Sequence, residues 1–211
     1  MGHDLGHTPF GHAGEKALAE VHPGGFRHNV QSIRVCDVLE ISRARQGMNL
    51  TEEVRDGILN HTGPDMPFTL EGQIVRTADR IAYVNHDTDD ALRCGIIMEE
   101  DLPDDVVKIL GTTTGARINT LTRDMVQASD GTGDIRQSKT CLDVMNKLRA
   151  FLFERVYYSD RVAEDAKRFE IDKVIPGLYN HYLNQGFTHE AAKDHLAGMT
   201  DRYAMEVYTE L

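Results

Sequence analysis

Hydrophobic residues recur at helical spacing along most of the chain. Val30, Ile33, Val38 and Ile41 lie three to five positions apart, the spacing of one face of an amphipathic helix. The same criterion predicts helices over residues 13–21, 27–45, 51–60, 69–87, 115–129, 142–158, 162–182 and 189–210, and one more after Pro103. Stretches of alternating β-branched residues are short and rare. We therefore expect an all-α bundle.

A turn-rich segment, Ser129–Asp134, is the strongest candidate for an internal boundary. Its glycines and aspartates interrupt the helical pattern on both sides. We expect residues 1–130 to form a core that carries the candidate chemistry described below, and residues 131–211 to form a helical extension packed on that core.

The predicted helix over residues 69–87 has a polar stripe opposite its apolar side. The apolar positions expected to face the core are Ile74, Val75, Ala78, Ile81, Ala82 and Val84. Asp79, Tyr83 and Asp87 follow one another at intervals of four residues and therefore share a face. An acidic stripe of this kind is often only a solvated surface. If the carboxylates instead point into the protein, a bound metal ion that balances their charge would account for their position.

Composition places the chain among soluble globular proteins with one or two domains. Its 211 residues are 40% hydrophobic and 27% charged, enough to build a sizeable core. No run of about 18 apolar residues is present, so we expect no membrane span. The first residues lack the basic and apolar stretches of a signal peptide, which favours a cytoplasmic location. Cys36, Cys94 and Cys141 are widely spaced and predicted to be reduced thiols.

The charge balance argues against a nucleic-acid partner. Lys and Arg number 23 against 34 Asp and Glu, a net charge of −11 and the wrong sign for coating a polyanion. A phosphate substrate remains compatible with this charge, because one divalent metal and a few placed cations can dominate the potential inside a cleft.

The densest group of candidate metal ligands lies near the amino terminus. His3, Asp4, His7 and His12 fall within ten positions, and imidazole with carboxylate is the usual ligand set for catalytic Mn, Fe, Co, Ni or Zn. If the segment is helical, His3 and His7 share a face, and His3 and Asp4 can both reach a metal above it. The alternative is plain surface polarity or an affinity-tag remnant. The intervening residues favour a packed motif: Leu5, Pro9 and Phe10.

Two ligands do not hold a catalytic metal tightly, so further residues must come from elsewhere in the chain. Asp79 is the candidate for a third ligand. His28 follows a glycine-rich turn and opens a predicted helix, where it can face an anion or serve only as a cap. His61 is interpreted as a C-terminal helix cap. The remaining isolated histidines are interpreted as structural: His181, His189 and His195.

Four segments of the chain form a recognisable set. They are His-Asp-Leu-Gly-His-Thr-Pro-Phe-Gly-His at 3–12, Phe-Arg-His-Asn-x-Gln-Ser at 26–32, Ala-Asp-Arg-Ile-Ala-Tyr-x-x-His-Asp at 78–87 and Ala-Gly-Met-Thr-Asp-Arg-Tyr-Ala at 197–204. Together they resemble the bacterial dGTPase-like branch of the HD superfamily of phosphohydrolases. The ten-residue first segment is far more specific than an isolated His-Asp pair, and the resemblance covers essentially the whole chain.

The resemblance implies a helical HD bundle with additional C-terminal helices that hydrolyses a deoxynucleoside triphosphate to the deoxynucleoside and inorganic triphosphate. The cofactor implied is a divalent metal ion, with Mn, Mg, Fe, Co, Ni and Zn all open. The implied metal ligands are His3, Asp4 and Asp79, together with a remote first histidine.

The same resemblance implies roles for the other candidates. His12 and His28 would lie along the triphosphate, and His7 would transfer a proton near the α-phosphate. The substrate-binding residues implied are Arg80 and Tyr83, which would contact phosphate or sugar, and Asp87, which would accept a hydrogen bond from the sugar 3′-hydroxyl.

The chain departs from the family pattern at its start. The remote first histidine belongs to an Arg-x-x-His helix upstream of the His-Asp pair, and no such helix precedes His3 here. We therefore expect weak metal binding and low activity. We also expect an exposed apolar patch that self-association would cover, giving a homo-oligomer.

Two other functions remain open from the sequence. One is an HD phosphohydrolase that acts on another nucleotide phosphate ester. The other is a degenerate HD domain that serves as a nucleotide-binding or oligomerisation module without catalysis.

Overall fold

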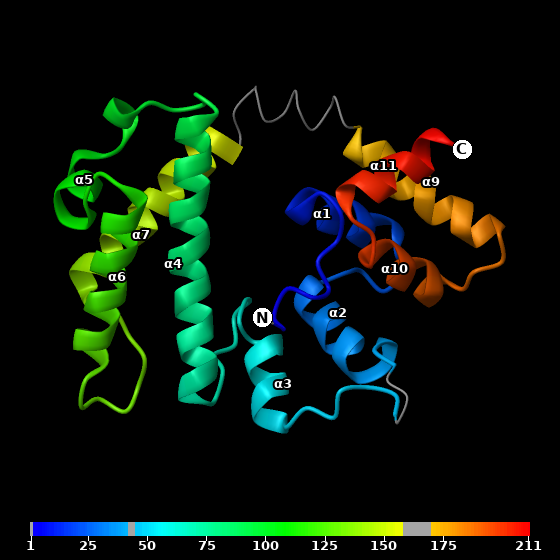
Figure 1. Ribbon diagram of the computed structural model, residues 1–211, viewed down its shortest axis with the longest axis horizontal. Coiled ribbons are helices and arrows are strands. Elements are labelled where there is room, and N and C mark those ends of the chain that lie inside the picture. Colours follow the sequence, from blue (N-terminus) through cyan, green and yellow to red (C-terminus); the bar gives the residue numbers. More distant parts are fainter. Residues whose placement is uncertain (1, 42–44, 158–169) are drawn as a thin grey trace. The chain divides into compact units, whose positions relative to one another are not determined.

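The structure, a computed structural model, describes residues 2–41, 45–157 and 170–211 (Figure 1). Helices build these ranges, which contain no β-strand and one isolated bridge, between Ile41 and Gln46. The predicted all-α class is therefore confirmed. None of the helices described is long and apolar enough to cross a bilayer.

The described helices separate into two compact units. Unit 1 contains residues 2–41, 45–65 and 170–211, and unit 2 contains residues 66–157. This division differs from the boundary expected near residue 130, because α7 (Lys139–Leu152) packs on α4 (Leu70–Arg93) within unit 2. The expected division into a metal-site core and an extension stays a prediction.

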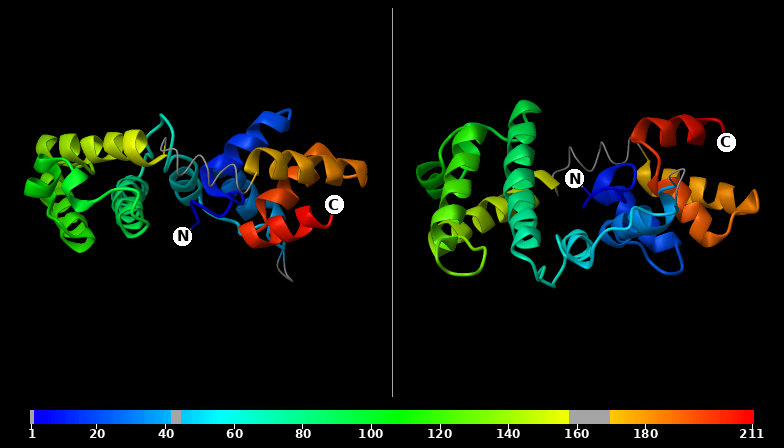
Figure 2. Two further views of the ribbon diagram at one scale, coloured as in Figure 1. Left: turned by 90° about the horizontal axis from the view of Figure 1, so that it is seen from above. Right: turned by 60° about the horizontal axis from the view of Figure 1, so that its bottom comes forward.

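Unit 1 is centred on α9 (Ile171–Asn184), which packs against α1 (Gly11–Val21) and the two last helices (Figure 2). Its core includes the fully buried side chains of Leu18 and Leu178. The remaining helices of this unit are α2 (His28–Arg34), the π-helical η1 (Val35–Leu39), α3 (Glu52–Leu59), α10 (His189–Ala197) and α11 (Asp201–Thr209).

A chain of hydrogen-bonding side chains crosses the core of unit 1. The Nδ1 atom of buried His22 lies 3.0 Å from the Tyr179 hydroxyl, which lies 2.8 Å from Nδ1 of His189. His22 Nε2 lies 3.2 Å from Glu190. Burial lowers the pKa of His22 even though Glu190 acts in the opposite direction.

Replacing His22 with glutamine is expected to weaken the acid sensitivity of folding. Because the pKa of His22 is lowered in the folded chain, the unfolded chain binds the proton first as the pH falls below about 6.5. The stability linked to neutral His22 is therefore present above that pH and is lost below it. The free energy of unfolding of the wild type and of His22→Gln is measured in urea at pH ~7 and ~5. An equal loss of unfolding free energy in both proteins would contradict it.

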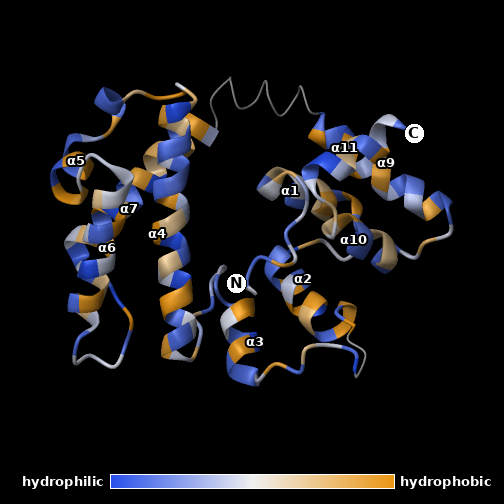
Figure 3. Ribbon diagram, viewed as in Figure 1, coloured by the Kyte–Doolittle hydropathy of each residue, from blue (hydrophilic) through white to orange (hydrophobic). Residues whose placement is uncertain are grey.

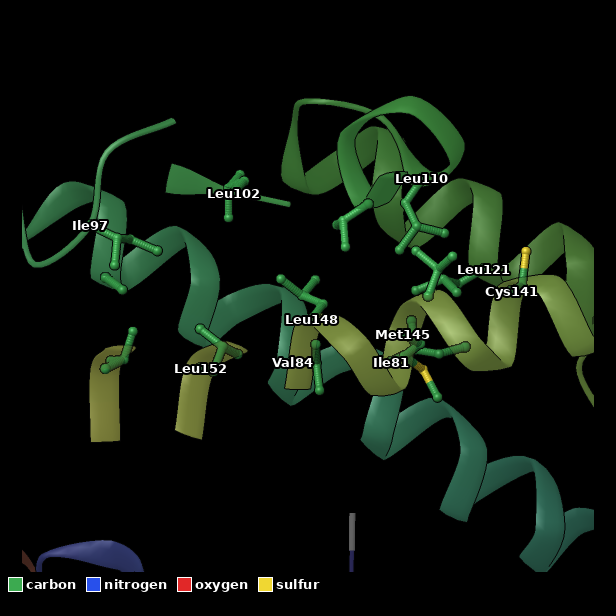
Figure 4. Packing of buried hydrophobic residues seen from close by; sticks show 14 residues of the cluster. Ile81, Val84, Ile97, Leu102, Leu110, Leu121, Cys141, Met145, Leu148 and Leu152 are labelled. Atoms are coloured by element: carbon green, nitrogen blue, oxygen red, sulfur yellow. The ribbon is translucent and has the colours of Figure 1, made fainter. Parts of the chain in front are cut away.

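Unit 2 is built around α4 (Leu70–Arg93), which packs on α6 (Thr114–Ser129) and α7. Leu121 and Leu148 are fully buried in its core, and Figure 4 shows them near Met145 and Val84. The other elements are the 3-10 helix η2 (Glu99–Asp101), α5 (Asp104–Leu110) and the π-helical η3 (Phe153–Tyr157).

Only part of the predicted apolar side of α4 enters the core. Ile81 and Val84 are 3% and 1% exposed, whereas Ile74 and Val75 are 42% and 38% exposed. Figure 3 colours several positions in the first half of this helix as hydrophobic. The prediction for Ile74, Val75 and Ala78 is wrong, because the core residues that α4 contributes to unit 2 begin at Ile81.

Two predicted helices end earlier than the periodicity indicated. The helix expected over residues 27–45 is α2 followed by η1, and Glu40 is extended; residues 42–44 lie outside the described residues. The helix expected over 189–210 is broken into α10 and α11, because Thr200 caps the latter through the backbone N–H of Tyr203. The first part of the helix predicted over 162–182 also lies outside the described residues.

Candidate functional site

The His-Asp pair lies in a turn of unit 1 and not on a helix. Residues 3–6 form the turn, in which the backbone N–H of His7 donates to the carbonyl of Asp4 at 3.1 Å. α1 begins only at Gly11. The prediction that His3 and His7 share a helix face is therefore wrong. The turn nevertheless brings Nε2 of His3 to 3.1 Å from Oδ2 of Asp4.

Ser32 on α2 fixes this turn. Its hydroxyl oxygen accepts from the backbone N–H of Gly6 at 2.9 Å and donates to the His3 carbonyl at 2.7 Å. The close contact between this turn and α2 requires a glycine at position 6. A Cβ there would lie 2.3 Å from the backbone nitrogen of Ser32 and 2.5 Å from the carbonyl oxygen of His28. The glycine of the first motif thus allows the His-Asp turn to contact α2.

Replacing Gly6 with alanine is expected to destabilise unit 1 by about 1–3 kcal/mol, the usual range for overpacking. The added methyl group would meet backbone atoms, which cannot rotate away as a side chain can. The matched control is Gly115→Ala on α6, where a Cβ meets nothing within 4 Å. That change should be neutral or slightly stabilising. Urea denaturation of both variants measures the difference, and equal free energies of unfolding would contradict the prediction.

The last motif of the sequence supports the loop before α1. Phe10 adopts a left-handed backbone conformation with φ 64°, and its N–H donates to the Asp201 carboxylate at 2.9 Å. Asp201 is the first residue of α11. The segment at 197–204 therefore contributes to the site indirectly, by holding the residue two positions before His12.

Glu15 connects two of the predicted site histidines. Its carboxylate lies 3.1 Å from Nδ1 of His12 and 3.0 Å from Nδ1 of His28, and it accepts the backbone N–H of His28 at 2.9 Å. Burial by itself would raise the pKa of Glu15, but the hydrogen bonds from both histidines outweigh it and lower the pKa far below its usual range. Glu15 is therefore a carboxylate at neutral pH.

His7 and His12 complete this histidine cluster. The ring of His7 stacks on His28 with centroids 4.5 Å apart, and its centroid lies 5.3 Å from that of His12. Burial and the neighbouring His28 lower the pKa of His7. The side chain of His12 is 84% exposed, whereas that of Glu15 behind it is 18% exposed. The cluster thus presents a solvent-facing imidazole whose inner nitrogen contacts a partly buried carboxylate.

His61 belongs to the same site, although the sequence indicated only a helix cap. Its Nδ1 does donate to the Ile58 carbonyl at the end of α3, at 2.7 Å. Its Nε2, however, lies 3.3 Å from Nε2 of His28 and 3.8 Å from Oδ1 of Asp4. The ring is 3% exposed and its centroid lies 4.9 Å from that of His3. No local pattern identifies this role, because the partners come from distant segments.

Glu15 was also missed, although a local signal existed. It stands three positions after His12, a spacing that places both side chains on one face at the start of a helix. Within unit 1, two groups of side chains bring their ligand atoms within 4.8 Å of one another. They are His7, His12, Glu15 and His28, and Asp4, His28 and His61.

The remaining predicted site residues lie on α4 in unit 2. Asp79, Tyr83 and Asp87 form the expected stripe of half-buried side chains. Tyr157, which the sequence did not single out, donates its hydroxyl to the Asp87 carboxylate. Burial and this carboxylate raise the pKa of Tyr157 well above its usual range. The meeting of Asp79 with His3 and Asp4 stays a prediction.

Arg80 and Tyr83 are held within unit 2. A guanidinium nitrogen of Arg80 donates to the side-chain oxygen of Asn146 at 3.2 Å. Tyr83 packs against the hydrophobic core of the unit. Both side chains therefore have defined positions on α4 beside Asp79 and Asp87.

Comparison with known proteins gives a consistent family. Residues 2–84 match the HD domain. The whole chain is 44% identical to a deoxyguanosinetriphosphate triphosphohydrolase-like protein of Caldanaerobacter subterraneus, of which it covers 65%. It is 41% identical to one of Clostridium perfringens and 33% identical to one of Nitrosomonas europaea, covering 67% and 73% of their lengths. The chain thus spans about two thirds of the relatives it matches. It belongs to the deoxyguanosinetriphosphate triphosphohydrolase-like family of HD-domain proteins.

Proposed function

We propose that this chain is a metal-dependent hydrolase that converts a deoxynucleoside triphosphate and water to the deoxynucleoside and inorganic triphosphate. The observation that carries the proposal is the pairing of solvent-facing His12 with the carboxylate of Glu15, in the same unit as the His3-Asp4 pair. The names of the relatives indicate dGTP as the first substrate to test. The homo-oligomeric state and the cytoplasmic location stay predictions.

His3, Asp4 and Asp79 are the proposed ligands of a divalent cation. The donor set fits such an ion, because an imidazole nitrogen and a carboxylate oxygen already lie 3.1 Å apart at the His-Asp turn. The convergence of Asp79 with this turn is part of the proposal. When bound, the cation would stabilise negative charge on phosphate oxygens and lower the pKa of a coordinated water.

His12 is the proposed proton donor. Water attacks the α-phosphorus, the bond from phosphorus to the 5′ oxygen breaks, and the electron pair stays on that oxygen, which takes a proton from His12. The attacking water loses one proton to solvent, and His12 takes a proton back from solvent before the next turnover. Glu15 holds Nδ1 of the ring and stabilises the protonated imidazole before transfer. This assignment differs from the sequence-based expectation for His7. Burial and His28 lower the pKa of His7, so a smaller fraction of it carries a proton at neutral pH.

The other side chains are proposed to bind the substrate. His7 and His28 lie beside His12 and would face the triphosphate. Arg80 and Tyr83 would contact phosphate or sugar, and Asp87 would accept a hydrogen bond from the 3′-hydroxyl. Tyr157 supports the last role, because its hydroxyl bonds Oδ2 of Asp87 and thereby orients the carboxylate.

Product analysis tests the proposal. The purified chain is incubated with each deoxynucleoside triphosphate and with Mn, Mg, Co, Ni, Fe or Zn in turn, and phosphate products are separated by ion-exchange chromatography. Deoxynucleoside and triphosphate in equal amounts are expected. Orthophosphate released from other nucleotide esters would instead indicate a different HD phosphohydrolase. Thermal stabilisation by nucleotide without any product would indicate a binding module.

A further inference from the structure

We propose that His22, Tyr179 and His189 form a hydrogen-bond relay in which a proton on exposed His189 keeps buried His22 uncharged in mild acid. The three residues lie at the end of α1, on α9 and at the start of α10, all in unit 1. Because α1 also carries His12 and Glu15, the relay stabilises the packing of this helix as the pH falls. It concerns pH dependence and not the chemical step, so it does not rest on the proposed function.

The Tyr179 hydroxyl is the group that the two rings share. It lies 3.0 Å from Nδ1 of His22 and 2.8 Å from Nδ1 of His189. Tyr179 is 1% exposed, and burial raises its pKa, so the hydroxyl keeps its hydrogen. A hydroxyl has a single hydrogen to donate and can accept at the same time. It can therefore donate to one ring only, and the other ring must donate to it.

Glu190 sets the direction of the relay. Its Oε1 lies 3.2 Å from Nε2 of His22. A hydrogen bond from Lys193 lowers the pKa of Glu190, which is therefore ionised at neutral pH and can only accept. The proton of uncharged His22 thus lies on Nε2, and its Nδ1 accepts from Tyr179. His189 must then donate to the Tyr179 oxygen, which places its own proton on Nδ1 and a lone pair on Nε2.

This direction decides where a further proton can be added. A proton added at Nε2 of His189 leaves both hydrogen bonds of Tyr179 in place. If His22 were then charged as well, both rings would donate to the Tyr179 oxygen and the hydroxyl hydrogen would lose its acceptor. Leaving a buried donor without a partner costs free energy. A charge on His189 therefore opposes a charge on His22.

Burial determines which ring is charged first. His22 is 7% exposed, whereas His189 is exposed, and burial disfavours the charged form of an imidazole. The charged groups that face His22 are Glu190 and Lys193 of α10, which act on its pKa in opposite directions. Arg34 of α2 lies 3.8 Å from Glu190 on the same side. Burial outweighs Glu190 and lowers the pKa of His22. The first proton is therefore expected on His189.

The tautomers of the wild-type chain give the first test. The imidazole nitrogens of ¹⁵N-labelled protein are followed by long-range ¹H–¹⁵N spectra from pH ~8 to ~5. At the upper limit, His22 is expected to carry its proton on Nε2 and His189 on Nδ1. A proton on Nε2 of His189 at this pH would overturn the proposal. It would be overturned equally by a folded chain in which His22 is charged before His189.

His189→Asn tests the coupling between the rings. The side-chain amide of asparagine can donate or accept at the place of Nδ1, so the Tyr179 hydroxyl can turn away from a charged His22. His22 is expected to become charged about half a pH unit or more above the wild type. The control is His195→Asn, an exposed histidine on the same helix, which should leave the titration of His22 unchanged. An unchanged titration in His189→Asn would contradict the relay.

Tyr179→Phe separates the relay from direct repulsion between the two charged rings. Direct repulsion does not need the hydroxyl, so it would give the same shift for His189→Asn whether or not Tyr179 is replaced. The relay instead predicts that the shift is lost in the double variant Tyr179→Phe with His189→Asn, compared with Tyr179→Phe alone. An equal shift would assign the effect to charge repulsion and reject the relay. If Tyr179→Phe does not fold, the wild-type tautomers and the His189→Asn titration still decide.

Discussion

Replacing Asp4 with asparagine is expected to remove most cation binding and to lower turnover of a deoxynucleoside triphosphate by about a hundredfold or more. Both oxygens of this carboxylate face histidine nitrogens, Oδ2 toward His3 and Oδ1 toward His28 and His61. Asparagine keeps the shape but has no charge and only one oxygen. A single change therefore weakens the proposed cation site.

The fold should survive this change. The turn at residues 3–6 is held by main-chain groups and by Ser32, not by the Asp4 side chain, which is half exposed. Bound metal, turnover and melting temperature are measured together, with Asp172→Asn as a control on the exposed part of α9. An Asp4→Asn protein with wild-type metal content and turnover would show that the proposed cation site does not lie at this turn.

Replacing Glu15 with glutamine is expected to lower kcat by about a hundredfold while changing KM much less. Glu15 contacts two imidazole rings and does not need to touch the substrate, so its loss disturbs the orientation and charge of His12 more than it disturbs binding. Its lowered pKa means that the charge removed is present throughout the neutral range. Glu15→Asp, which restores the charge on a shorter side chain, should recover part of the activity.

The matched control is Glu20→Gln, an exposed glutamate on the same helix, which should retain wild-type kinetics. Because Glu15 also accepts hydrogen bonds from His28, its replacement affects the stability of the fold as well. Unfolding in urea is therefore measured for Glu15→Gln and Glu20→Gln. Folding free energy linked to Glu15 is present above pH ~4.5 and lost as the pH falls, since the carboxylate has a lower pKa in the folded chain. Equal kcat for the two glutamine variants would exclude the proposed role of Glu15.

Much of the fold could be predicted from local pattern. Amphipathic periodicity indicated the helices because each helix places its apolar residues on one face, whatever it packs against. The starts of α2 at His28 and of α4 at Leu70 follow from adjacent residues in the same way. The burial of side chains along α4 was harder to predict. Ile74 and Ile81 are equally apolar, and only the packing of unit 2 leaves Ile74 exposed and buries Ile81.

The sequence by itself determined an all-helical protein with a dense histidine and carboxylate motif at residues 3–12. Only the tertiary structure decided which side chains meet that motif. His61 joins His28 across 33 positions, and Asp201 reaches Phe10 across 191. Helical periodicity reports hydrogen bonds and faces within about four residues, whereas these contacts depend on which distant helices bury their apolar faces together.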